Sequence, residues 1–200
     1  MAIKPILFNT EMVRANLEGR KSCTRRLVRF LPGENPQWTG YIRDGLMLYN
    51  GRNEPCIMKA PYQPGDILYV RETWCDDRQF THDSTPGRYF YKASESENFK
   101  WKPSIHMPKE AARIWLKVTD VRVERLHEIT EDGAKAEGAI DNRGFIHSPE
   151  NEYDRIHTAR EHFIKIWNGT IKKSNLNCYG WDANPWVWVI EFERCEKPEK

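Results

Sequence analysis

An alternating segment near the middle of the chain, residues 113–126, constrains the fold more than any other. Its apolar residues occupy even positions first and then odd positions: Ile114, Leu116, Val118, Val121 and Val123. Alternation with a period of two is typical of a β-strand that buries one face, and the change of phase predicts a bulge or bend at Thr119 and Asp120. The segment therefore predicts one long, bent strand within a sheet.

Shorter signals surround this strand. The sequence predicts strands at four further places: residues 46–49, 67–72, 88–93 and 186–192. It predicts helices at three places: residues 10–18, 131–137 and 153–167. Asn9 or Thr10 caps the first helix and Thr130 the second, and Gly19 and Gly138 follow their last turns. Several strands with few helices predict an α+β fold, a small, partly open β-barrel with flanking helices and long loops.

Length and composition narrow the class of protein. With 200 residues the chain suits one domain, and 8 Trp, 8 Tyr and 8 Phe supply bulky side chains for a core. The 5 cysteines are scattered and never form a C-x-x-C pair, which favours free thiols in a reducing cytoplasm and predicts no zinc site. We expect no signal segment and no membrane span, because no apolar run approaches about 20 residues.

Basic residues gather in residues 14–29. This stretch holds six of them against the single acidic Glu18: Arg14, Arg20, Lys21, Arg25, Arg26 and Arg29. Its net charge is +5, whereas that of the whole chain is +2. Such a segment would attract a phosphate or another anionic substrate. Lys21 stands three residues before Thr24, and in a cleft that excludes water burial would lower the lysine's pKa, so that its amine could take the hydroxyl proton.

Five landmarks occur in an order that resembles a known family. They are G-R-K-S-C-T-R-R at 19–26, P-G-D at 64–66, L-H-E-I-T at 126–130, E-G at 137–138 and V-I-E-F at 189–192. In this order the chain is similar to the ASCH domain, a small PUA-like β-barrel. The resemblance implies a single domain over residues 1–200 with three long insertions, at about 31–64, 73–112 and 141–180.

Within that family, the lysine-x-x-threonine spacing resembles the small bacterial N4-acetylcytidine amidohydrolases. The resemblance implies that Lys21 is the general base, Thr24 the nucleophile and Glu137 the proton donor. The chemistry leaves a second division of roles open, in which Lys21 stabilises an oxyanion and Glu137 positions a water molecule. Residues 101–108 resemble a longer group of ASCH proteins that is common in phages and prophages.

Four further residues are candidates for substrate binding: Arg20, Arg26, Glu72 and Trp74. Arg26 would bind a phosphate or anchor one of the two carboxylates, Glu72 or Glu137. Glu72 follows a buried strand and competes with Glu137 as the acid, or else pairs with a neighbouring arginine. Trp74 is one of several tryptophans that could stack on a nucleobase.

The resemblance implies a cytoplasmic hydrolase, independent of metals and other cofactors, that removes an acyl group from the exocyclic amine of a modified nucleoside, free or in RNA. His157 and His162 stand five residues apart, so they do not form the i,i+4 pair of a helical metal site. Two rival functions stay open. One is a non-enzymatic RNA-binding module, and the other is a ribonuclease that uses the same lysine and carboxylate on single-stranded RNA. The acyl group and the oligomeric state stay open as well.

Overall fold

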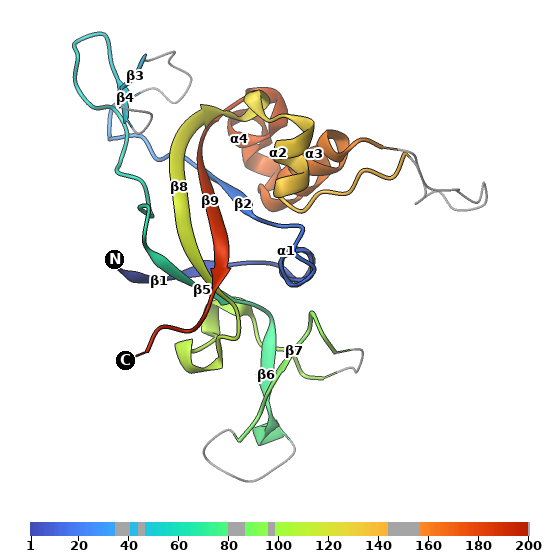
Figure 1. Ribbon diagram of the computed structural model, residues 1–200. Helices are drawn as coiled ribbons and strands as arrows, with labels where there is room; N and C mark the ends of the chain where they lie inside the picture. Colours follow the sequence, from blue (N-terminus) through green and yellow to red (C-terminus); the bar gives the residue numbers. More distant parts are fainter. Residues whose placement is uncertain (35–40, 44–46, 80–86, 96–98, 144–156, 200) are drawn as a thin grey trace. The chain divides into compact units, whose positions relative to one another are not determined.

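The computed structural model describes residues 1–34, 41–43, 47–79, 87–95, 99–143 and 157–199. Its main sheet has the strand order β1-β5-β8-β9-β2 (Figure 1). These strands are β1 (Ile3–Leu7), β5 (Ile67–Arg71), β8 (Trp115–Arg125), β9 (Trp186–Cys195) and β2 (Cys23–Leu27). The mixed α+β class is confirmed. Within the described residues the sheet is open, with β1 and β2 at its two ends, so the predicted barrel is not closed.

The chain divides into two compact units, each taken by itself below. Unit 1 comprises Met1–Arg20, Pro64–Thr119 and Phe192–Lys200, and unit 2 comprises Lys21–Gln63 and Asp120–Glu191. Strands β8 and β9 contribute residues to both units. The expectation of a single domain with three insertions stays a prediction.

In unit 1, β1 runs parallel to β5, from the pair of Ile3 and Ile67 to the pair of Leu7 and Arg71. β5 runs antiparallel to the first part of β8. The unit also contains β6 (Trp74–Asp76), β7 (Tyr89–Tyr91) and the 3-10 turns η1 (Asp77–Gln79), η2 (Ser104–His106) and η3 (Lys109–Ala111). Its buried apolar cluster consists of Ile67, Trp74, Met107, Ala111, Ala112 and Trp115.

The first helix of unit 1, α1 (Thr10–Leu17), begins and ends where its caps predict. The side chain of Asn9 accepts a hydrogen bond from the Met12 N–H at 2.8 Å, which satisfies one of the free donors of the first turn. The last cap residue is Glu18, and Gly19 follows with a φ of +77°, a conformation that glycine adopts without strain. The helix therefore delivers the chain directly to the basic segment.

In unit 2, β2 runs antiparallel to β9, from the pair of Cys23 and Glu191 to the pair of Leu27 and Val187. The helices α2 (Glu131–Ala136), α3 (Ala159–Thr170) and α4 (Leu176–Tyr179) gather beside these strands (Figure 1). The unit also contains β3 (Tyr41–Arg43), β4 (Met47–Tyr49) and the 3-10 turns η4 (Leu126–Glu128), η5 (Lys173–Asn175) and η6 (Trp181–Ala183). Its apolar cluster consists of Cys23, Leu126, Ile129, Ala134, Ala139, Ala159, Phe163, Trp167, Val187 and Val189.

The change of phase in β8 is confirmed. Leu116 and Val118 are buried, and after residues 119–120 the buried positions are Val121 and Val123. The strand bends along its length in Figure 1. At the same point the strand passes from unit 1 into unit 2.

Among the described residues, the start predicted for the third helix, residues 153–167, is wrong. Residues 153–156 lie outside the described part of the chain, and α3 begins only after Thr158. The Thr158 side chain accepts from the Glu161 N–H, and the Glu161 carboxylate accepts from the Thr158 N–H. This capping box fixes the start of the helix, which then continues past the predicted stop to Thr170.

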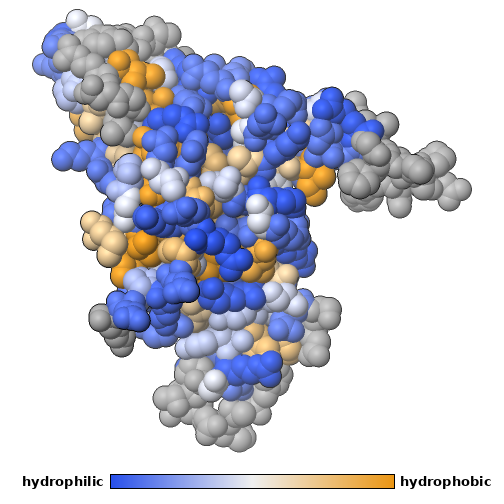
Figure 2. Space-filling view, viewed as in Figure 1, coloured by the Kyte–Doolittle hydropathy of each residue, from blue (hydrophilic) through white to orange (hydrophobic). Residues whose placement is uncertain are grey.

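Hydrophilic residues cover most of the described surface on the face drawn in Figure 2. Exposed large apolar side chains come from separate segments, among them Leu31, Ile42, Ile105 and Ile140. Single exposed apolar residues are normal on protein surfaces. The informative side chains of this protein are therefore the buried polar ones.

Candidate functional site

Backbone pairing at the start of β2 brings Lys21 and Glu137 together. The two residues form an isolated antiparallel bridge, and the Ser22 N–H donates to the Ala136 carbonyl at 2.9 Å. Glu137 is the C-terminal cap of α2, whose N-terminal cap is Thr130, as predicted. The end of this short helix is thereby held against β2, the last strand in the sheet order.

The two side chains form a buried ion pair. Nζ of Lys21 lies 2.8 Å from Oε2 of Glu137, and the side chains are 0% and 5% exposed. The same Nζ donates to the carbonyl oxygens of Glu137 and Cys23, each at 2.8 Å. Burial lowers the pKa of Lys21, the Glu137 carboxylate opposes this change, and the charge of Arg26 adds to it. Lys21 therefore gives up its proton more readily than a lysine in water.

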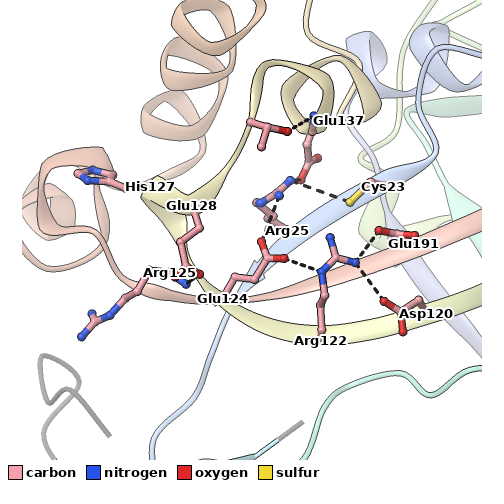
Figure 3. A network of polar contacts seen from close by, with 12 residues as sticks. Cys23, Arg25, Asp120, Arg122, Glu124, Arg125, His127, Glu128, Glu137 and Glu191 are labelled. Carbon is pink, nitrogen blue, oxygen red and sulfur yellow. Dashed lines mark hydrogen bonds and ion pairs between the residues drawn. The ribbon is translucent and has the colours of Figure 1, made fainter. Parts of the chain in front are cut away.

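Arg25 approaches the other oxygen of Glu137. Its Nη1 lies 3.3 Å from Oε1 of Glu137, and its Nη2 lies 3.5 Å from Oε2 of Glu124. Figure 3 shows the Arg25 guanidinium between these two carboxylates. From the sequence Arg25 is only one of six basic residues, because partners 112 and 99 residues away leave no local signal.

The polar network continues through Arg122 to partly exposed carboxylates (Figure 3). Its Nε lies 2.5 Å from Glu124, and its Nη1 lies 2.5 Å from Glu191 and 3.0 Å from Asp120. Arg122 thus holds the carboxylate that in turn holds Arg25. Two arginines and a glutamate on neighbouring elements therefore restrict where the Glu137 side chain can lie.

Thr24 and Arg26 alternate with Cys23 and Arg25 along β2, so they lie on its opposite face. Thr24 is fully buried, and its hydroxyl has no hydrogen-bond partner among the described residues. The Lys21 amine is therefore not hydrogen-bonded to this hydroxyl. It does contact the carbonyl of the peptide that joins Cys23 to Thr24.

Arg26 and Tyr62 belong to the same group of charges. Arg26 donates from Nη1 to the Arg25 carbonyl at 3.2 Å. Burial lowers the pKa of Arg26, and the negative charges of Glu137 and of an ionised Tyr62 oppose this change. Burial raises the pKa of Tyr62, and Arg26 opposes that rise. Glu137 therefore interacts with an arginine from each face of β2, as a carboxylate at the edge of a strand can.

Cys23 is the other potential nucleophile of β2. Its thiol is buried, and burial together with the charge of Glu137 raises its pKa to about 12, although Arg25 opposes the rise. A thiol with this pKa is almost entirely protonated near neutral pH, and the thiolate is the reactive form. Cys23 is therefore a poor nucleophile near neutral pH, and the role of Thr24 as the nucleophile stays a prediction.

Much of the positive charge of the basic segment, residues 14–29, is paired with carboxylates of the protein. At the surface Arg14 pairs with Glu11 and Arg20 pairs with Glu18. The buried cations of the segment share one buried carboxylate, as described above. Carboxylates of the protein itself therefore neutralise most of this concentrated positive charge. The role of Arg20 in binding substrate stays a prediction.

Glu72 and Trp74 lie in unit 1. Glu72 is 1% exposed, and its two oxygens receive Nε and Nη2 of Arg113 at 2.9 Å each, the pairing with an arginine that its position allowed. Trp74 is 4% exposed and belongs to the apolar cluster of the unit. Its ring faces Tyr89 at 5.8 Å and the Lys102 ammonium at 4.8 Å. Roles for both residues in binding substrate stay predictions.

Metal ligands do not gather in the described part of the chain, which contains no group of three or more His, Cys, Asp and Glu suited to a metal ion. The rings of His157 and His162 lie 5.0 Å apart, and Nδ1 of His162 accepts the Ile140 N–H at 2.9 Å. Among the same residues no helix has the length and apolar character needed to cross a membrane.

Comparison with known proteins adds little to this geometry. No protein-family model matches the chain, and no curated protein does. A solved structure that is similar to it is the high-resolution crystal structure of an ASCH domain from Lactobacillus crispatus JV V101. The identity is 13%, the alignment covers 96% of this chain and 79% of that one, and the TM-score is 0.42. A TM-score of this size does not establish a shared fold, so the family stays a prediction from the sequence motifs.

The fold and the site together define an α+β protein with a buried lysine–glutamate pair just before β2 and, on that strand, a buried hydroxyl without a hydrogen-bond partner in the described part of the chain.

Proposed function

We propose that this protein hydrolyses the exocyclic N-acyl amide of a modified nucleoside, of the N4-acetylcytidine kind. The observation that carries the proposal is the buried pair of Lys21 and Glu137 just before β2, the strand whose buried Thr24 hydroxyl has no hydrogen-bond partner among the described residues. Amide hydrolysis needs a nucleophile, a base and a proton donor. The ordered sequence motifs of the ASCH resemblance supply the substrate class.

The reaction can be written with these three side chains. The Lys21 amine, in the neutral form that burial favours, takes the Thr24 hydroxyl proton while the threonine oxygen attacks the acyl carbonyl. The resulting ammonium passes a proton to Oε2 of Glu137, 2.8 Å away, and Glu137 delivers it to the departing nucleoside amine. This step leaves an acyl ester on Thr24, and both partners return to their starting charges.

Water then hydrolyses the ester. Lys21 removes a proton from the attacking water molecule and returns one to the threonine oxygen as the carboxylic acid departs. In the ligand-free protein Lys21 is not hydrogen-bonded to Thr24. Catalytic hydrogen bonds are often long before substrate binds and shorten in the complex, so the proposal requires the lysine amine to move to the threonine oxygen when substrate binds.

The pairing of the basic segment favours the hydrolase over the RNA-binding module. A surface that binds nucleic acid needs cations free to contact phosphates. In this segment Arg14 and Arg20 pair with neighbouring acidic residues, and Lys21 and Arg25 share Glu137. Arg29 is exposed, and one exposed arginine makes a weak phosphate-binding surface.

The test is turnover of N4-acetylcytidine, followed by its ultraviolet spectrum and by chromatography of the released cytidine. We expect turnover by the wild type and a loss of at least about 100-fold, the usual scale for a catalytic group, in Thr24→Val, Lys21→Met and Glu137→Gln. Ser22→Ala changes an exposed hydroxyl on the same segment and is the matched control.

The same preparations are incubated with labelled single-stranded RNA. Cleavage that survives Thr24→Val but not Lys21→Met would replace the hydrolase with a ribonuclease. Binding of RNA that weakens steeply with salt, without turnover of any acylated nucleoside, would replace it with a binding module. Full turnover in Thr24→Val would remove the threonine from the mechanism.

A further inference from the structure

Arg25 is a buried arginine to which neither the sequence motifs nor the reaction above assigns a role. Its side chain is 3% exposed, and a buried guanidinium carries a desolvation cost that long hydrogen bonds of 3.3 and 3.5 Å offset only in part. Its Nε has no hydrogen-bond partner among the described residues. Because burying this charge is unfavourable, the effect of the Arg25 charge on its neighbours needs to be explained.

The surroundings of Arg25 are shaped to hold the guanidinium in one place. On one side, a Cβ added to Gly133 of α2 would lie 3.5 Å from Nη2 of Arg25. On another side, the Phe163 ring of α3 lies 6.0 Å from the guanidinium carbon. Glu124 accepts from Nη2 and is itself bonded to Arg122 (Figure 3). These contacts leave Nη1 directed at Glu137.

Glu137 divides its two oxygens between two cations. Oε2 receives the Lys21 ammonium at 2.8 Å and Oε1 receives Arg25 at 3.3 Å. A positive charge near a lysine favours the neutral amine. With Arg25 present, a second cation shares the Glu137 carboxylate. The net stabilisation of the Lys21 ammonium by its surroundings is therefore smaller. Arg26, on the other face of β2, acts in the same direction.

We infer that Arg25 is a positioning residue, which holds the Glu137 carboxylate against Lys21 and places a second positive charge on that carboxylate. The inference rests on the proposed function for its catalytic meaning. The electrostatic coupling between Arg25 and Lys21 stands apart from that function and can be measured without any substrate.

A change in pH acts on every titrating group around Lys21, and these groups come from several elements. Glu137 comes from the end of α2, Cys23 and Arg26 come from β2, and Tyr62 interacts with Arg26. Burial raises the pKa of Cys23 to about 12 and raises that of Tyr62 as well. Cys23 therefore titrates above the ordinary lysine range, and burial shifts the pKa of Tyr62 upward while it shifts that of Lys21 downward.

The first experiment is the pH dependence of kcat/KM on N4-acetylcytidine. In the wild type the rate rises with pH as Lys21 loses its proton. In Arg25→Met the rising limb should move to higher pH by about one unit, the scale of a neighbouring charge. Arg25→Lys keeps the charge and should restore most of the limb's position. Lys165→Met removes an exposed positive charge from α3 of the same unit and should move nothing.

The second experiment needs no turnover. Because burial lowers the pKa of Lys21, the folded state binds fewer protons than the unfolded state between the folded and unfolded pKa values. The free energy of unfolding of the wild type must therefore rise with pH in that window relative to Lys21→Met. The same comparison in an Arg25→Met background should show a smaller rise, confined to higher pH. Urea unfolding from pH 6 to about 11, a range that brackets the ordinary lysine pKa of about 10.4, provides both curves.

The outcomes separate the two proposals. An inactive wild type with the reduced rise in Arg25→Met refutes the hydrolase and keeps the coupling. An equal loss of rate at every pH, with an unchanged rise, refutes the positioning role and makes Arg25 structural. If Arg25→Met does not fold, Arg25→Gln and Arg25→Lys replace it. An identical limb in Arg25→Gln and Arg25→Lys would then overturn the inference.

Discussion

Replacing Thr24 with valine should make the protein more stable while it removes the proposed activity. The side chain is fully buried, and its hydroxyl has no hydrogen-bond partner among the described residues. A buried polar group without a partner has lost its hydrogen bonds to water and gained none in return. Valine has nearly the same shape and removes that cost without opening a cavity.

The size of the effect follows from the burial of Thr24. Mutational data place the cost of a buried, unpaired hydroxyl at about 1–3 kcal/mol. Because a valine methyl also fits the apolar surroundings, we expect the free energy of unfolding to rise by about 1–2 kcal/mol. For a chain of this size that corresponds to an increase of roughly 2–8 °C in Tm.

Urea unfolding and calorimetry of the wild type and Thr24→Val measure this difference. Thr130→Val is the matched control, because the Thr130 hydroxyl accepts the Gly133 N–H at 3.0 Å and caps α2. The control should lose about 1 kcal/mol. A Thr24→Val protein that is less stable than the wild type would mean that the hydroxyl is hydrogen-bonded in solution, and the account of a nucleophile awaiting a partner would fail.

Three further outcomes follow from the buried groups. Glu137→Gln should lower the free energy of unfolding by about 3–5 kcal/mol at neutral pH, because it leaves two buried cations without their carboxylate. Unfolding curves should show this loss shrinking as pH rises and Lys21 loses its proton. A loss that does not change with pH would contradict the prediction. A thiol reagent should modify the exposed Cys178 first and Cys23 only on unfolding, and Cys178→Ser should remove the fast phase. Hydrogen bonds from two cations lower the pKa of the buried Asp76 to about 2, so its contribution of about 2 kcal/mol should be present at neutral pH and be lost as pH falls from about 4 to 2; Asp76→Asn should be destabilised at pH 7 and match the wild type in acid.

The features predicted correctly from the sequence are local ones. The cap of α1 depends on Asn9 and Met12, three residues apart, and the cap of α2 depends on Thr130 and Gly133. The bend of β8 is encoded in the order of its own apolar residues. In each case the interacting groups lie within one or two turns or pleats of the chain, so the pattern and its physical cause occur in the same short window.

The start of α3 was within reach of the same reasoning. Thr158 and Glu161 are the capping box that begins the helix, and both are visible in the sequence. Apolar periodicity alone extends the predicted helix upstream to residue 153. A capping residue interrupts that pattern because its own backbone is extended, with a ψ of 164° at Thr158.

Strands that depend on distant partners give weaker signals. β1 has only five residues, with a proline at its centre, and becomes a strand because β5 pairs with it from 64 residues away in the sequence. β6 is shorter still and pairs with β7. Pairing of this kind is set by tertiary contacts, which outweigh the local preference of such short segments.

The candidate site also combines features that are visible in the local sequence with features that depend on distant partners. Thr24 lies in β2, whereas Lys21 lies two residues before this strand and pairs with Glu137. The spacing of Lys21 and Thr24 could be read from the sequence. The neighbours of Arg25 could not, because the two carboxylates that hold it come from β8 and α2.

A purely structural account of the buried charges must explain why they are there at all. Ion pairs of this kind recover little more than their desolvation cost, and apolar residues of similar volume often stabilise a core equally well. The same strand also buries the Thr24 hydroxyl, which has no hydrogen-bond partner among the described residues. Both features reduce stability relative to an apolar alternative, and both lie within four residues, from Lys21 to Thr24. Stability therefore does not account for them, whereas the proposed hydrolysis, in which the Lys21 amine takes the Thr24 hydroxyl proton, would give both groups a role.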